Sequence, residues 1–221
     1  MSFSVIIPSR NAANLVPCVR AVREHEPTAP IIVVDDGVDW TAVPLYSKAR
    51  IQTFIPGVQP FVFARACNSG IKACEGDVIL LNDDALLETP FGFHGLEAAS
   101  QAHPEFGVIS VVTNVVGNLA QQAKDIGLRE EPRTLAFVCV YIPRATINRI
   151  GLLDERYVRY GYDDNDYCRR VRDAGLKLGI FDDCFVDHSS LHSTFRGSPR
   201  NIAADLAAGR EIYCGKWGDA D

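Results

Sequence analysis

Residues 76–84 read GDVILLNDD, an apolar run that leads directly into three polar side chains. Four consecutive apolar residues without polar alternation are typical of a strand that is buried on both faces of a sheet. The run ends in Asn82, Asp83 and Asp84, whose side-chain oxygens suit a hard divalent cation such as Mg²⁺ or Mn²⁺. The same residue types also end strands in ordinary polar turns, so this stretch alone leaves both interpretations open.

Strand-like and helix-like segments alternate upstream of this stretch. Three further strand-like runs lie at residues 3–8, 30–34 and 49–55. Residues 11–24 and 61–74 have the apolar spacing of helices and lie between these strand-like runs. This alternation predicts an α/β domain with a mainly parallel central sheet and helices on both faces. Ligands bind beyond the carboxyl ends of strands in such sheets, and Asp35 and Asp36 end the second strand, although Asp-Asp-Gly is also ordinary turn chemistry.

The second half of the chain is less regular. Its predicted strands and helices cover residues 106–112, 134–142, 144–150, 165–174 and, weakly, 201–208. Residues 113–133 are rich in Asn, Gln and Gly and predict a surface excursion. No repeat or linker divides the chain, so we expect a single domain over residues 1–221.

Length and composition limit the class of protein. Of the 221 residues, 47% are hydrophobic and 23% are charged, which supports one sizeable globular domain. The net charge of −6 gives no strong signal for nucleic acid as a partner. No apolar run is long enough to form a transmembrane segment and no secretion signal is present, so we expect a cytoplasmic protein; a peripheral position at a membrane stays compatible. Seven cysteines without a Cys-x-x-Cys pair predict reduced, buried thiols.

A third acidic cluster lies in residues 160–166, YGYDDND. Carboxylates at a helix start complement the helix dipole, whereas a calcium loop is disfavoured because its glycine and distal glutamate are missing. A further interpretation makes one carboxylate a general base for an attacking hydroxyl, although the helix N-terminus would weaken that base. Asp166 lies about one turn from Arg169 and Arg170, so we assign it to local ion pairing.

Two histidines, His188 and His192, lie near the end of the chain's second half. A lone histidine is more often structural than ligating. Near a diphosphate-bound cation, however, an imidazole supplies one more ligand, and the sequence does not decide between the two histidines.

Taken in order, these segments resemble the family 2 glycosyltransferases, which have the GT-A fold. The matching segments are SVIIPSRN (4–11), IVVDDG (32–37), FARACNSGI (63–71), GDVILLNDD (76–84), IGLLDE (150–155) and GYDDNDYCRR (161–170). Their order and spacing carry the resemblance, which runs from about residue 4 to residue 196. It implies a nucleoside-diphosphate sugar as donor, a divalent cation (Mn²⁺ or Mg²⁺) and inversion at the anomeric carbon.

The resemblance also implies roles for individual residues. The residues expected to hold the donor are Pro8, Ser9, Arg10, Asp35, Asp36, Arg65 and Asp83. The residues expected to hold the cation are Asp84 and His188, with Asn82 offering a neutral oxygen. Asp164, beside Asp163, is expected to deprotonate the acceptor hydroxyl.

These roles divide the single domain into a nucleotide-sugar-binding half at about residues 1–110, an acceptor-binding half at about 111–196, and a C-terminal tail at 197–221. The transferred group is expected to be a hexosyl or deoxyhexosyl unit. The acceptor is a saccharide, a lipid-linked molecule or another hydroxyl, and we expect loops at residues 113–133 and 189–200 to select it.

Departures from the family pattern keep two alternatives open. Asn82 replaces the first acid of the metal motif, Asp163 replaces the usual glutamate, and an extra residue in residues 159–162 leaves the register of the base open by one position. These changes keep open the alternative of a catalytically weak nucleotide-sugar-binding module. A nucleotidyltransferase is the other alternative, but it normally has a glycine-rich phosphate loop, and residues 8–14 contain no glycine.

Overall fold

One mixed sheet forms the centre of the molecule. The computed structural model describes residues 3–122, 125–191 and 201–218, and within them nine strands join in the order β3-β2-β1-β4-β8-β6-β9-β5, with β7 paired to β9. The strands are β1 Phe3–Ser9, β2 Ile31–Asp35, β3 Thr53–Pro56, β4 Asp77–Leu81, β5 Leu86–Leu87, β6 Phe106–Thr113, β7 Leu128–Glu130, β8 Cys139–Ile142 and β9 Lys177–Asp187. Strands β3, β2, β1 and β4 are parallel, and antiparallel β8 joins β4 to β6. The predicted α/β fold with a mainly parallel sheet is confirmed. The antiparallel pairs are those that β5, β7 and β8 make with their neighbours.

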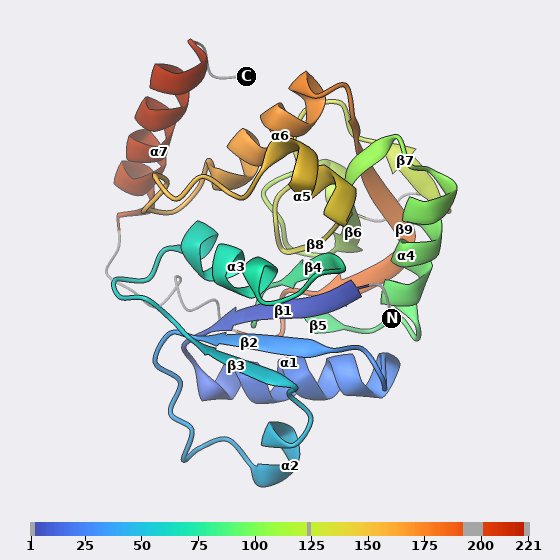
Figure 1. Ribbon diagram of the computed structural model, residues 1–221, viewed down its shortest axis with the longest axis vertical. Coiled ribbons are helices and arrows are strands. Elements are labelled where there is room, and N and C mark those ends of the chain that lie inside the picture. The colour runs from blue at the N-terminus through green and yellow to red at the C-terminus, as the bar shows by residue number, and fades with distance from the viewer. Residues whose placement is uncertain (1–2, 123–124, 192–200, 219–221) are drawn as a thin grey trace.

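Helices cover both faces of this sheet. They are α1 Ala12–His25, α2 Leu45–Lys48, α3 Phe63–Lys72, α4 Gly92–Ala102, α5 Arg144–Ile150, α6 Asp163–Asp173 and α7 Ile202–Trp217, with a short 3₁₀ helix η1 at Leu119–Gln121. Figure 1 shows α1 on one side of β1, β2 and β3, and α3 on the other. Along β1, Val5 and Ile7 share a core with α1, whereas Ile6 shares a core with α3. Burial on both faces explains the absence of polar alternation in this strand.

The structure differs from the predicted elements in the second half. Residues 134–142 form a strand only over β8, because the side chain of Gln121 bonds to both the N–H and the carbonyl of Ala136 and takes the place of a neighbouring strand. Strand β9 was not predicted, because Asp182 and Asp183 interrupt its apolar pattern. Asp182 lies in the sheet as the ion-pair partner of Arg129, at 2.6 Å.

Two helices are longer than their sequences indicated. Helix α6 begins at Asp163 rather than at residue 165, and α7 continues to Trp217 rather than ending near residue 208. The last turns of α7 pack Tyr213 against Tyr162, just before α6, and bring Trp217 to Asp166 within α6; local sequence does not reveal these tertiary contacts.

The remaining expectations concern membranes and thiols. No helix in the described residues combines the length and the apolar character needed to cross a membrane. All seven cysteines are free thiols, and five of them are buried. Burial raises the pKa of the Cys168 thiol to about 12, so this thiol stays protonated at neutral pH.

Candidate active site

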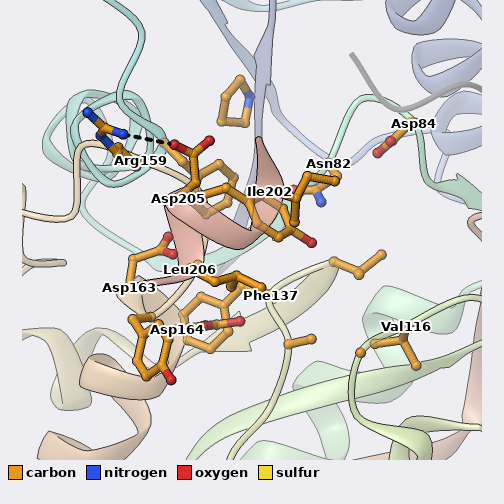
Figure 2. A pocket seen from close by; sticks show the side chains of 18 of the residues that line it. Asn82, Asp84, Val116, Phe137, Arg159, Asp163, Asp164, Ile202, Asp205 and Leu206 are labelled. Atoms are coloured by element: carbon orange, nitrogen blue, oxygen red, sulfur yellow. Dashed lines mark hydrogen bonds and ion pairs between the residues drawn. The ribbon is translucent and has the colours of Figure 1, made fainter. Parts of the chain in front are cut away.

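A cavity of about 630 Å³ lies beyond the carboxyl ends of β1 and β4. Among its lining residues are the predicted site residues Pro8, Ser9, Arg10, Asn82, Asp83, Asp84, Asp163, Asp164 and His188. Figure 2 shows Asp84 on one side of the cavity and Asp163 and Asp164 on the other. Side chains from distant parts of the chain therefore surround one space. His192 lies outside the described residues.

Asp84 and His188 form a close pair on the β4 side of the cavity. Asp84 lies in the turn between β4 and β5, and His188 follows β9, whose Asp187 pairs with Leu86 of β5. The imidazole Nε2 lies 3.2 Å from Asp84 Oδ1. Strand pairing between β5 and β9 thus brings together two residues that are 104 positions apart.

The second nitrogen of His188 shows what this pair can bind. Nδ1 lies 2.6 Å from the carbonyl oxygen of Val115, and a carbonyl only accepts, so Nδ1 carries a proton. In the neutral ring Nε2 then has no proton, and its lone pair faces an oxygen of the Asp84 carboxylate. This contact is repulsive unless a proton or a cation lies between the two atoms. A metal-ligating histidine commonly donates its other N–H to a carbonyl in this way.

The spacing of these ligands suits a divalent cation. Two ligands at about 2.1 Å from one octahedral ion, at right angles, lie about 3 Å apart, close to the spacing of the Asp84 and His188 atoms. Asn82 lines the same cavity with an amide that makes no hydrogen bond within the part of the chain that the structure describes. Only two titratable ligands meet here, because no group of three His, Cys, Asp or Glu side chains within the described ranges is arranged to hold a metal.

Asp83 points away from this pair and toward the end of β1. Its Oδ2 accepts a hydrogen bond from the Ser9 hydroxyl at 2.7 Å, and its Oδ1 accepts one from Asn14 Nδ2 at 3.5 Å. Burial raises the pKa of Asp83 to about 6, against the lowering effect of the Ser9 hydrogen bond. Asp83 therefore fixes the turn after β4 to β1 and α1 as well as lining the cavity.

Asp163 and Asp164 occupy the first turn of α6, on the other side of the cavity. The chain enters this helix through Tyr162, a non-glycine residue with φ of 71° and ψ of −11°. Such a backbone conformation carries strain and is found preferentially at functional sites. The ring of Tyr162 packs against Tyr213 of α7, with ring centroids 5.6 Å apart. Helix α7 thus holds the turn that presents the two carboxylates.

Burial changes the acidity of both carboxyl groups. It raises the pKa of Asp163 to about 8, and the charge of Asp164 adds to the shift. It raises the pKa of Asp164 to about 6, while hydrogen bonds from backbone groups, including the N–H of Asn165 at 2.8 Å, act in the opposite direction. The helix N-terminus alone would make Asp164 a weaker base, but here burial outweighs it. A carboxylate with a raised pKa is better matched to proton abstraction near neutral pH.

Asp166 is a structural centre rather than a cavity residue. Its fully buried carboxylate accepts hydrogen bonds from Arg170 Nε at 2.9 Å and from Trp217 Nε1 at 2.9 Å, and it lies 2.6 Å from Lys216 Nζ. The predicted pairing with Arg170 is confirmed. Arg169 instead pairs with Asp173, at 3.5 Å.

Three of the predicted donor residues do not line the cavity. Asp35 accepts hydrogen bonds from the backbone of the following turn and from Trp40 Nε1, at 2.5 Å. Asp36, whose pKa is raised by burial, accepts from Gln59 Nε2 at 2.6 Å. Arg65 donates to the carbonyl of Val58, at 2.9 Å, and to that of Pro60.

Arg10 connects this group of residues to the cavity. It lines the cavity, and its Nε lies 3.8 Å from Asp36 Oδ2. Asp36 is therefore one side chain away from the space that holds the other predicted residues.

Helix α7 contributes cavity residues that the sequence did not indicate. Ile202, Asp205 and Leu206 of its first turns line the cavity, and Asp205 pairs with Arg159 at 3.4 Å (Figure 2). Phe61, Phe63 and Phe137 add apolar walls. In the sequence, Phe61 and Phe63 fall in a helix-like segment and Phe137 in a strand-like one, without a role in the site, and the weak helix predicted at residues 201–208 carried no signal for a site.

Solved structures with a similar fold are glycosyltransferases. The mannosyltransferase PcManGT from Pyrobaculum calidifontis, solved with GDP-Man and Mn²⁺, matches with a TM-score of 0.72 and 16% identity over 100% of this chain and 65% of that chain. TarS 1-349 from S. aureus, solved with UDP-GlcNAc, matches with a TM-score of 0.70 and 16% identity, over 96% and 65%. GalNAc-T7, solved with UDP, GalNAc and Mn²⁺, matches with a TM-score of 0.67 and 14% identity, over 85% and 44%. At these identities the likeness concerns the fold.

Sequence comparisons agree with the fold. A curated relative, the uncharacterized protein y4gI of Sinorhizobium fredii (strain NBRC 101917 / NGR234), is 24% identical in an alignment of length 206 that covers 78% of this chain and 23% of that protein. The chain thus spans under a quarter of that relative and no more than about two thirds of the solved chains. The sequence profile of glycosyl transferase family 2 matches residues 4–129, more than half of the chain. The chain therefore belongs to glycosyl transferase family 2 and has the GT-A fold of glycosyltransferases.

Proposed function

We propose that this domain transfers a hexosyl or deoxyhexosyl unit from a nucleoside-diphosphate sugar to an acceptor hydroxyl, with inversion and with the help of a divalent cation. One observation carries the proposal: the Asp84–His188 pair and the Asp163–Asp164 pair lie on opposite sides of one cavity. A single displacement requires the leaving group and the base on opposite faces of the sugar. The solved structures of PcManGT and GalNAc-T7, both containing Mn²⁺, support the metal part of the proposal.

The metal side of the cavity would hold the leaving group. Asp84 and His188 would bind Mn²⁺ or Mg²⁺, with Asn82 offering an oxygen directly or through water. When bound, the cation neutralises charge that builds up on the departing diphosphate. The protein's own part is to orient these ligands, which the Val115 carbonyl does for His188.

The helix side of the cavity would supply the base. Asp164 would accept the proton of the acceptor hydroxyl while that oxygen bonds to the anomeric carbon. The bond between this carbon and the diphosphate oxygen breaks, and the nucleoside diphosphate leaves with the electron pair. Asp163, with its higher pKa, would keep a proton at neutral pH and so avoid placing two negative charges side by side.

The nucleoside would occupy the β1–β2 side of the cavity. Pro8, Ser9 and Arg10 line this side together with Asp83. Arg10 would contact the nucleoside and, through its ion pair, place Asp36 near it. The side chains of Asp35 and Arg65 bond to the backbone of nearby turns, so they would act by holding these turns in place beside the nucleoside.

Product analysis tests the reaction class. The chain is incubated with Mn²⁺ and a panel of UDP- and GDP-sugars, and the released nucleotide is identified. We expect a nucleoside diphosphate, and we expect Asp164→Asn to lower turnover by roughly 10²–10⁴-fold while donor affinity changes little. Asp173→Asn, at the exposed far end of the same helix, serves as the matched control and should behave as the wild type.

Three results would count against this function. Release of pyrophosphate would indicate a nucleotidyltransferase. Donor binding without hydrolysis or transfer would indicate a binding module. Turnover of Asp164→Asn equal to that of Asp173→Asn would remove Asp164 from the mechanism.

A further inference from the structure

A second cavity, of about 370 Å³, adjoins the first. Its walls are the loop after β6, the segment between β7 and β8, and the first turn of α6. The residues that line both cavities are Gly117, Ala136, Asp164 and Asn165. The proposed base therefore lies on the boundary between two spaces. Asp84 and His188 line only the first of them.

Part of the lining of the second cavity is polar and has unused hydrogen-bonding capacity. Glu131 is only 7% exposed; its Oε1 accepts the N–H of Arg133 at 3.1 Å, and its Oε2 accepts no hydrogen bond from any described residue. The side-chain amide of Asn165 also makes no hydrogen bond within the described ranges. Glu131 is a buried residue and Asn165 is half-buried, and both keep polar atoms that no described residue bonds, so a ligand with hydrogen-bond donors and acceptors can pair with them.

Tertiary contacts hold this polar wall in place. The backbone N–H of Glu131 bonds to the carbonyl of Leu178 in β9, at 2.9 Å. Arg172 of α6 donates to the carbonyls of Pro132 and Arg133, at 3.1 and 2.5 Å. The cavity is thus preformed against the same helix that carries Asp164, as binding sites for small ligands usually are.

The first cavity differs in chemistry at its rim. Val158, Tyr160, Ile202 and Leu206 line it, and each is substantially exposed. The second cavity is lined by the polar residues Asn118, Glu131, Arg133 and Thr134, and its apolar lining residues are Ala136 and the fully buried Leu135. A lipid chain would fit the first lining better than the second, whereas a molecule rich in hydroxyls fits the second.

We propose that the second cavity is the acceptor subsite and that it takes a saccharide, whose hydroxyls hydrogen-bond to Glu131 and Asn165 and place one hydroxyl against Asp164. The inference rests on the proposed function, because it assigns the first cavity to the donor and its cation. A general base must lie within hydrogen-bond reach of the proton it removes, and only the boundary between the cavities gives Asp164 access to both substrates.

The experiment compares saccharide-stimulated turnover with donor hydrolysis in the full chain. Nucleoside diphosphate release is measured with Mn²⁺ and the best donor, alone and with glucose, galactose, mannose, N-acetylglucosamine, cellobiose, lactose or dodecanol. We expect at least one saccharide to stimulate release. In Glu131→Ala the ratio of stimulated release to hydrolysis should fall at least about tenfold, the effect of losing a hydrogen bond to a charged group. Glu130→Gln, the exposed neighbour paired with Lys177, is the matched control and should keep the wild-type ratio.

A second variant covers the case in which Glu131→Ala fails to fold. A Cβ at Gly117 meets no atom within 4 Å, so Gly117→Leu is expected to fold and to narrow the boundary between the cavities. It should lower the same ratio. A wild-type ratio in either folded variant, or stimulation by dodecanol and by no saccharide, would overturn the proposal. If the wild type neither hydrolyses nor transfers any donor, the proposed function itself fails, which is a different result.

Discussion

Asp164 combines two opposing influences on one carboxyl group. Its position in the first turn of α6 favours the anion, because backbone N–H groups and the helix dipole stabilise negative charge there. Burial favours the neutral acid and is the larger effect, so the pKa rises to about 6. The same carboxyl group is therefore ionised at neutral pH and still basic enough to take a proton.

This balance predicts the pH dependence of transfer. Below pH 6 Asp164 gains a proton and can no longer act as a base, so the rate should rise with pH through about 6. The measurement is kcat for nucleoside diphosphate release between pH 4.5 and 8, at saturating Mn²⁺ and donor. Asp173→Asn should show the same profile, and the residual activity of Asp164→Asn should lack this limb. A rate that is level from pH 4.5 to 8 would contradict the assignment.

At the scale of elements, α7 contacts both the first cavity and the segment around α6. Its first turns line the cavity, while its last turn donates to Asp166 through Lys216 and Trp217. Lys216 also lies 2.9 Å from Asp154, in the segment before α6. The helix therefore links the cavity wall to the element that carries the proposed base.

We predict that this link contributes to stability. Lys216→Met removes one of the groups that pair with the fully buried carboxylate of Asp166, which should cost about 1–3 kcal/mol. For a chain of this size Tm falls by roughly 2–4 °C per kcal/mol. The matched control is Lys72→Met, at the exposed end of α3, which should unfold close to the wild-type temperature. Equal melting temperatures for the two variants, measured by circular dichroism, would exclude a role of the Lys216 contact.

The elements also show what the sequence could and could not predict. Strands β1, β2 and β4 were predictable because burial on both faces leaves unbroken apolar runs. Strand β9 was hidden because it places Asp182 in the sheet against Arg129, and the length of α7 was hidden because its contacts are tertiary. The motifs named the residues on both sides of the cavity, but not the second cavity or Asp205, which depend on how loops and α7 meet.

At the scale of the whole molecule, the central sheet places the proposed cation ligands and the proposed base around one cavity. The parallel strands β1 and β4 end at the donor side, and β8 connects β4 to the mixed half that carries α6. This cavity has more acidic than basic lining side chains: Asp83, Asp84, Asp163, Asp164 and Asp205 against Arg10 and Arg159. A diphosphate would meet a negative environment here unless a cation accompanies it.

The most direct test of this account is donor binding as a function of metal. Thermal unfolding is followed with UDP- and GDP-sugars, each with Mn²⁺ or with EDTA, for the wild type, Asp84→Asn and the control Asp173→Asn. Donor at 100 times its Kd should stabilise the wild type by about 2.7 kcal/mol only when Mn²⁺ is present, and Asp84→Asn should lose this increment. Equal stabilisation in EDTA, or the same Mn²⁺-dependent increment in Asp84→Asn, would contradict a donor held by a cation between Asp84 and His188.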